Sequence, residues 1–133
     1  MPASFDLEIR VEPSDIDQLG HVNNVTYVRW VQEVAVAHWN AIAPAEDKAK
    51  LLWVVLRHEI DYKQAAFASE VLRARTWVGD STRLRFERHT EFTRLRDSKL
   101  LVKARTLWCP IDLTTRRPVE VNSELRALFS SNE

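Results

Sequence analysis

The segment NVTYVRWVQEVAVAHWNA, residues 24–41, decides the fold of this chain of 133 residues. At 100° per residue its polar side chains fall on one narrow stripe, formed by Thr26, Arg29, Glu33 and Asn40. Nearly all the other side chains are apolar, so we expect a helix of roughly 25 Å that protein surrounds on most sides. Five of the residues are valines, which are poor helix formers, so tertiary packing must hold the helix.

Alternating segments flank this helix and predict strands. Residues 4–12 alternate strictly between apolar and polar side chains, as in a half-buried strand. Four further strands are expected at 53–62, 70–78, 82–93 and 99–109. In the first of these four, the alternation places on one face Val54, Leu56, His58, Ile60 and Tyr62.

The connections between these segments are short. Turns are expected at 79–81, 94–98 and 112–118, a connector at 44–50, and a short last helix at 123–129 with Ser123 as its N-cap. Short connections imply antiparallel neighbours. The pattern therefore predicts a single α+β domain over residues 1–133, with an antiparallel sheet that curls around one long helix. That architecture is the hot-dog fold.

Composition excludes several classes of function. The 19 basic and 19 acidic side chains balance, which argues against general attraction to nucleic acid or to an anionic membrane. The single cysteine, Cys109, allows no intrachain disulfide, and the apolar run LLWVVL at 51–56 is too short to span a bilayer. We expect a soluble, cytoplasmic protein.

The stretch DIDQLGHVNN, residues 15–24, places many polar groups directly before the helix. We call it the polar loop. A helix N-terminus has unpaired N–H groups and a partial positive charge, so it can stabilise an oxyanion that develops on a carbonyl. Asp17, on the same loop, is a candidate nucleophile or general base, and Asp15 has the same chemistry. A turn or capping role is the common alternative for such aspartates.

The loop carries a family pattern, D-x-x-G-H-V-N-N-x-x-Y, which starts at Asp17 and ends at Tyr27. The pattern continues in Asp61-Tyr62, Cys109, 111–113, Thr115 and 124–126. Over almost its whole length the chain thus resembles the hot-dog acyl-CoA thioesterases of the 4-hydroxybenzoyl-CoA thioesterase type. The resemblance implies Asp17 as the catalytic carboxylate and the Asn24 backbone N–H as carbonyl polariser. One departure is Lys63-Gln64, where this family commonly has a basic residue and a proline, so the acyl preference does not follow from the resemblance.

Other residues of the pattern have two interpretations each. His21 either orients Asp17 in catalysis or holds the loop, and Asn23 either contacts substrate or caps the helix. Gly20, Tyr27 and Tyr62 are candidate substrate contacts, although Gly20 also suits a special backbone conformation and Tyr27 also suits the core. Glu33 is the alternative catalytic carboxylate, on the helix itself.

Other chemistries lack their motifs. The four histidines show no metal-ligand spacing, and no G-x-S-x-G, G-x-G-x-x-G or P-loop occurs, so we expect neither a metal nor a cofactor. The resemblance implies an acyl-CoA or acyl-carrier-protein substrate and a homodimer or homotetramer, in which the strands at 53–62 pair across a two-fold axis. The alternatives are a hot-dog module that binds acyl thioesters without cleaving them, and a hot-dog dehydratase or hydratase.

Overall fold

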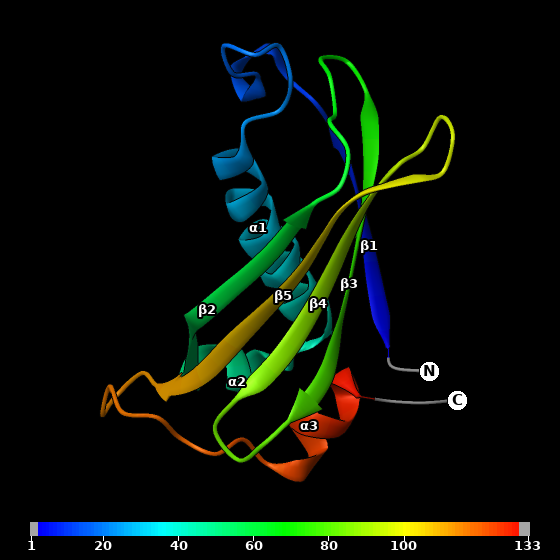
Figure 1. Ribbon diagram of the computed structural model, residues 1–133. Helices are drawn as coiled ribbons and strands as arrows, with labels where there is room; N and C mark the ends of the chain where they lie inside the picture. Colours follow the sequence, from blue (N-terminus) through cyan, green and yellow to red (C-terminus); the bar gives the residue numbers. More distant parts are fainter. Residues whose placement is uncertain (1–2, 131–133) are drawn as a thin grey trace.

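The computed structural model describes residues 3–130, which form a five-stranded antiparallel sheet with a long helix lying across one face (Figure 1). The strand order in space is β1-β3-β4-β5-β2, and every neighbouring pair is antiparallel. The elements are β1 (Ser4–Arg10), a short 3-10 helix (Pro13–Asp15), α1 (Asn24–Ile42), α2 (Ala45–Lys50), β2 (Leu51–Tyr62), β3 (Val71–Ser81), β4 (Phe86–Arg94), β5 (Lys99–Asp112) and α3 (Ser123–Phe129). The predicted α+β hot-dog architecture is confirmed.

The main core lies between α1 and the sheet. The helix contributes Tyr27, Trp30, Val31 and Val34, each at most 3% exposed. The strands contribute apolar side chains from their inner faces, among them Leu72, Ala74, Phe92, Leu101 and Val102. Each such side chain stabilises the fold by roughly 1.5–3 kcal/mol through removal of apolar surface from water. This packing holds a helix that its valines alone would not stabilise.

The opposite face of α1 is exposed, which corrects the expectation of a helix surrounded on most sides. Val25 is 72% exposed and Val36 is 50% exposed. Five strands cover one side of the helix and leave the other side open within residues 3–130, where Val25 and Val36 are exposed beside the polar Arg29 and Glu33.

The edge strand β2 also differs from the prediction. A β-bulge between Val55 and Arg57 shifts its register against β5. One extra residue reverses the alternation, so Trp53 and His58 face inward while Leu52 and Leu56 face outward. The predicted common face of Val54, Leu56, His58, Ile60 and Tyr62 is therefore wrong: Val54 and Leu56 are on the outside, and His58 and Ile60 are on the inside.

Several predicted boundaries move. The connector at 44–50 contains α2, where acidic residues in the first turn and lysines in the last turn complement the helix dipole. β1 ends at Arg10, β5 continues to Asp112, and β4 begins only at Phe86.

The predicted turn at 79–81 is part of β3. The turn itself lies at 82–85, closed by the Thr82 N–H donating to the Arg85 carbonyl at 2.8 Å. Gly79 serves a close approach, because a Cβ there would lie 2.8 Å from Nε2 of His89. The N-cap of α3 is Asn122 rather than Ser123, since Asn122 Oδ1 accepts from the Leu125 N–H at 2.7 Å.

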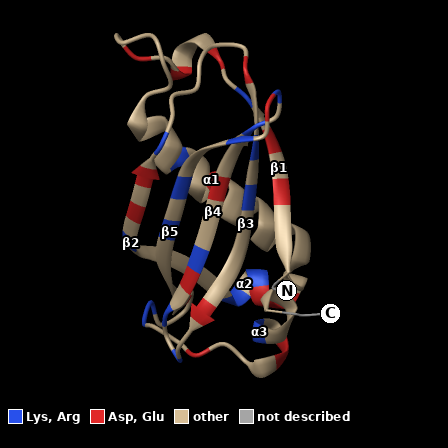
Figure 2. Ribbon diagram, turned by 45° about the vertical axis from the view of Figure 1, so that its right-hand side comes forward, with Lys and Arg blue, Asp and Glu red and all other residues tan. Residues whose placement is uncertain are grey.

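Charged residues recur along the strands of the sheet (Figure 2), and several form ion pairs between neighbouring strands on the outer face. Arg75 donates two hydrogen bonds to the Asp6 carboxylate at 2.8 and 2.9 Å. Arg105 forms ion pairs with Glu87 at 2.8 Å and with Glu59 at 3.2 Å. These cross-strand pairs suit a solvated surface. Cavities lie instead at the polar loop and on the helix side of the sheet. Within residues 3–130, no helix is both long enough and apolar enough to cross a membrane.

Candidate active site

The polar loop folds into a tight turn at the head of α1. The Asp17 N–H donates to the His21 carbonyl at 2.9 Å, and the Gly20 N–H donates to the Asp17 carbonyl at 3.1 Å. Gly20 has φ +89°, a conformation that side chains disfavour. The interpretation of Gly20 as a conformational residue therefore has structural support, and a substrate contact by Gly20 stays a prediction.

The turn orients the carboxylate of Asp17. Its Oδ1 accepts from the Leu19 N–H at 2.9 Å, whereas its Oδ2 lies 3.7 Å from His21 Nδ1. The side chains of Asp17 and His21 are 24% and 34% exposed, so both remain open to solvent or ligand. The fold thus brings these two predicted residues together, with one carboxylate oxygen held by a backbone N–H and the other facing His21.

The head of α1 forms beside this carboxylate. Asn23 is the N-cap, as predicted: its Oδ1 accepts from the Val25 N–H at 2.9 Å, and its carbonyl accepts from the Thr26 N–H at 2.9 Å. Asn24 is the first helical residue, and its N–H has no partner within residues 3–130. An open pocket here is lined by Ile16, Asp17, Gln18, Leu19 and Asn23.

Two tyrosines support the helix head. The Tyr62 hydroxyl, from the end of β2, donates to the Asn24 carbonyl at 3.2 Å. Tyr27 is 3% exposed and packs edge-on against Trp30, Phe92 and Tyr62. Burial raises the pKa of Tyr27, and its hydroxyl has no partner within the described chain. Tyr27 is a core residue here, and Tyr62 links β2 to the site.

The alternative carboxylates have structural roles. Asp15 is 4% exposed; it accepts from the Glu12 N–H at 2.9 Å and pairs with Arg29 at 3.2 Å. Glu33 is 56% exposed on α1 and pairs with the same arginine at 3.3 Å. Asp17 is therefore the carboxylate of the polar loop that combines exposure with a position at the helix head.

The chain is similar to known proteins in both sequence and fold. A family model described as the thioesterase-like superfamily matches residues 11–129. The chain belongs to this superfamily. The resemblance to hot-dog acyl-CoA thioesterases is thereby confirmed.

The related proteins are thioesterases. A chloroplastic palmitoyl-acyl carrier protein thioesterase from Gossypium hirsutum is 24% identical over 98% of this chain, which spans about a third (34%) of that relative. A 1,4-dihydroxy-2-naphthoyl-CoA thioesterase from Synechocystis has a TM-score of 0.81 at 17% identity, with 96% of each chain covered. A DHNA-CoA thioesterase from Staphylococcus aureus has a TM-score of 0.78 at 20% identity, with 88% of this chain and 80% of that chain covered. These structural likenesses show the fold.

Two buried polar residues of this chain, Arg88 and His38, were not identified from the sequence as candidates for a functional site. His38, on the inner face of α1, is 1% exposed, and Arg88, on β4, is 8% exposed; Arg88 Nη1 lies 2.9 Å from His38 Nδ1. The alternation of β4 could have predicted the position of Arg88, because it places this residue on the inner face with Phe86 and Phe92. Within residues 3–130, no group of three or more His, Cys, Asp or Glu side chains is placed to hold a metal ion. Cys109 is buried, in keeping with an apolar packing role.

Proposed function

We propose that this protein is an acyl-CoA thioesterase that uses water to convert an acyl thioester into a carboxylic acid and a free thiol. The observation that carries the proposal is the pocket at the head of α1, where the partly exposed Asp17 carboxylate and the helix N-cap Asn23 line one open space. Membership of the thioesterase-like superfamily supports the same reaction class.

The helix head supplies the electrostatic part of the mechanism. With its carbonyl oxygen near the unpartnered Asn24 N–H, the thioester would develop its negative charge against the positive end of α1. One such donor can stabilise a transition state by roughly 3 kcal/mol. Tyr62 keeps this turn in place through its bond to the Asn24 carbonyl.

Asp17 supplies the attack in one of two ways. As a nucleophile, its carboxylate adds to the carbonyl and expels the thiolate, which gives an acyl-enzyme anhydride that water then hydrolyses. As a general base, it takes a proton from water, and the oxygen of that water adds to the carbonyl before the thiolate leaves. In both routes the Leu19 N–H fixes one carboxylate oxygen, and His21 is a positioning residue near the other.

We infer a homodimer in which two β2 strands pair edge to edge. β2 is an edge strand, and it exposes Leu52, Val54 and Leu56 at 37–49% on its outward side. An open edge with apolar side chains favours pairing with another strand. If the two-fold axis lies near the middle of β2, Leu51 of one chain faces Tyr62 of the other. The Asp17 turn of one chain then lies near the Leu51 end of its partner.

Thiol release from a panel of acyl-CoAs and acyl-carrier-protein thioesters tests the proposal. Wild type should turn over at least one thioester, and a folded Asp17→Asn variant should lose at least about a hundredfold, roughly 2.7 kcal/mol. Equal activity of both proteins would refute the role of Asp17 and direct attention to Glu33. Binding of acyl-CoA without turnover would favour a non-catalytic module, and hydration of crotonyl-CoA without thiol release would favour a hydratase.

A further inference from the structure

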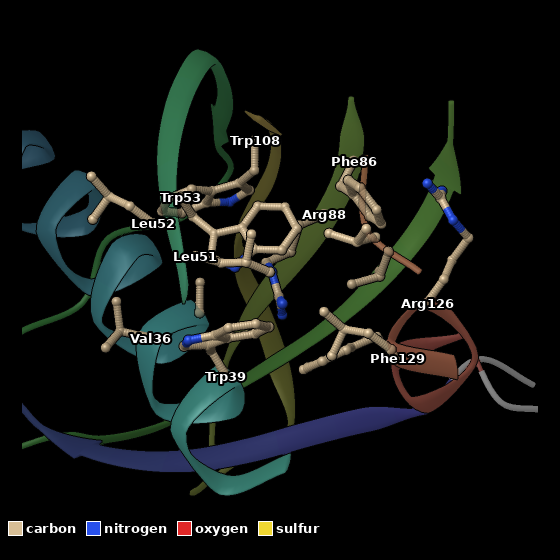
Figure 3. A pocket seen from close by; sticks show the side chains of 14 residues that line it. Val36, Trp39, Leu51, Leu52, Trp53, Phe86, Arg88, Trp108, Arg126 and Phe129 are labelled. Carbon is tan, nitrogen blue, oxygen red and sulfur yellow. The ribbon is translucent and has the colours of Figure 1, made fainter. Parts of the chain in front are cut away.

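A second cavity lies on the helix side of the sheet, between α1, α3 and the strands β2, β3, β4 and β5 (Figure 3). We call it the aromatic pocket, because its lining includes Trp39, Trp53, Phe86, Trp108 and Phe129. Its volume is about 200 Å³. Val36 and Leu52 also line it and are 50% and 40% exposed, so the pocket reaches the surface beside the outward edge of β2.

Arg88 lines this pocket as a buried cation with no carboxylate partner. Its Nη1 lies 2.9 Å from His38 Nδ1 and 3.2 Å from Thr76 Oγ1, both neutral partners, and no acidic side chain within residues 3–130 contacts it. Burial lowers its pKa to about 10, so it remains charged at neutral pH. Arg94, three inward positions further along β4, pairs with both Glu70 and Asp97. A buried charge that lacks a partner is costly, so its retention in a pocket points to a ligand that supplies one.

The remaining polar groups of the pocket are also donors. The indole N–H groups of Trp53 and Trp108 are buried and have no acceptor among residues 3–130. The lining residues include two arginines, Arg88 and Arg126, and no acidic residue. Arg126 lies over the Phe86 ring at 4.6 Å and donates to Ser81 and to backbone carbonyls of the β3–β4 turn. The pocket thus combines apolar walls with a surplus of donors and one unpaired buried charge.

We propose that the aromatic pocket binds the acyl part of the substrate and that Arg88 selects acyl groups with a carboxylate at the far end. Apolar walls accommodate the carbon chain, and the guanidinium pairs with the distal carboxylate in a region from which water is largely excluded. This proposal rests on the proposed thioesterase function and specifies its substrate class.

The pocket lies toward the opposite end of α1 from Asp17. It is lined by Ala35, Val36 and Trp39, whereas the helix begins at Asn24, so about 18 Å of helix separates its head from Val36. In the dimer inferred above, the Asp17 turn of the partner lies near the Leu51–Trp53 side of the pocket. A thioester attacked by one chain would then insert its acyl group into the other.

The test compares three pairs of acyl-CoAs of equal chain length: succinyl and butyryl, adipoyl and hexanoyl, suberoyl and octanoyl. For wild type we expect kcat/KM for the carboxylate member to exceed that of its partner at least tenfold in at least one pair. Arg88→Met, which keeps the volume and removes the charge, should reduce that ratio at least tenfold. Arg88→Lys, which keeps a positive charge, should retain more of the preference than Arg88→Met.

A matched control and a binding experiment keep the result interpretable. Arg75→Met removes an arginine that is paired with Asp6 on the outer face, and should leave the ratio as in wild type. Calorimetry on Asp17→Asn measures affinity without hydrolysis, so it tests the pocket even if no thiol is released. Three results would each overturn the proposal. The first is a wild-type kcat/KM ratio near one in all three pairs, and the second is an equal loss of the carboxylate preference in Arg88→Met and Arg88→Lys. The third is equal affinity of Asp17→Asn for the two members of every pair in calorimetry.

Discussion

Single residues of the polar loop decide where the Asp17 carboxylate lies. Gly20 permits the turn through its φ of +89°, Leu19 holds one oxygen, and His21 lies near the other. The sequence pattern placed all these residues in one loop. It could not separate Asp17 from Asp15, because both precede the helix and only tertiary contacts show that Asp15 is buried against Arg29.

Gly20→Ala should disturb this turn. Alanine at positive φ costs about 1–2 kcal/mol, although nothing within 4 Å would clash with the added Cβ. We expect the urea midpoint to fall and kcat to fall with it, because the carboxylate loses its fixed position. Gly20→Asn is the control: asparagine tolerates this conformation better, so stability and kcat should lie between alanine and glycine. Equal stability of the three proteins would contradict the strain argument.

His38 should make stability pH-dependent. Burial, with a smaller effect from Arg88, lowers its pKa to about 4 from 6.5. Its ring contacts Phe5 and Phe129 as well as Arg88, so the folded protein keeps it neutral. Between these two values the unfolded state binds the extra proton, so the free energy of unfolding falls as the pH falls from about 6.5 to 4, by up to about 3 kcal/mol.

Urea titrations at several pH values measure this dependence. In His38→Asn the side-chain oxygen still accepts from Arg88 but does not titrate. The difference between wild type and this variant should therefore shrink or reverse toward pH 4. Parallel stability curves for the two proteins over this range would show that His38 does not carry the effect.

At the scale of elements, the long helix and its flanking strands were predictable because their periodicities are strong. The face assignment of β2 was not, since the bulge between Val55 and Arg57 depends on pairing with β5. The exposure of Val25 and Val36 on α1 was likewise not predictable, because a valine looks the same in sequence whether the sheet covers it or not. The aromatic pocket was missed because its lining comes from six separate elements.

Helix capping offers a matched pair of variants. Asn23 caps α1 and Asn122 caps α3 through side-chain oxygens that accept backbone N–H bonds at 2.9 and 2.7 Å. Each change to alanine should cost about 1 kcal/mol of unfolding free energy, measured in urea. Asn23→Ala should in addition lower kcat, because the unravelled first turn no longer presents the Asn24 N–H. An equal effect of both variants on kcat would contradict this role of the helix head.

At the scale of the whole molecule, the separation of Asp17 from the aromatic pocket predicts complementation between subunits. Asp17→Asn removes the carboxylate, and Val36→Trp places a large ring at an exposed residue that lines the pocket. In a mixed dimer, one site would combine the intact Asp17 of one chain with the intact pocket of the other. Random mixing should then restore about a quarter of wild-type activity from two weakly active parents.

Thiol release after co-refolding the two variants measures this recovery. Refolding each variant alone provides the baseline. Activity that stays at the average of the parents would place both parts of the site in one chain.

The bulge divides β2 into two halves in which opposite sets of positions, even-numbered and then odd-numbered, point outward. Before it, even-numbered side chains from Leu52 to Leu56 point outward, and after it the odd-numbered Arg57, Glu59 and Asp61 do. The outward side of this edge strand is therefore apolar before the bulge and charged after it. In saturation mutagenesis of β2, we expect polar substitutions to be tolerated at even-numbered positions up to 56 and at odd-numbered positions from 57 onward. Deletion of Leu56 should be tolerated better than deletion of a residue elsewhere in the strand, because it removes the extra residue and leaves His58 and Ile60 in the interior with their pairing to β5 unchanged.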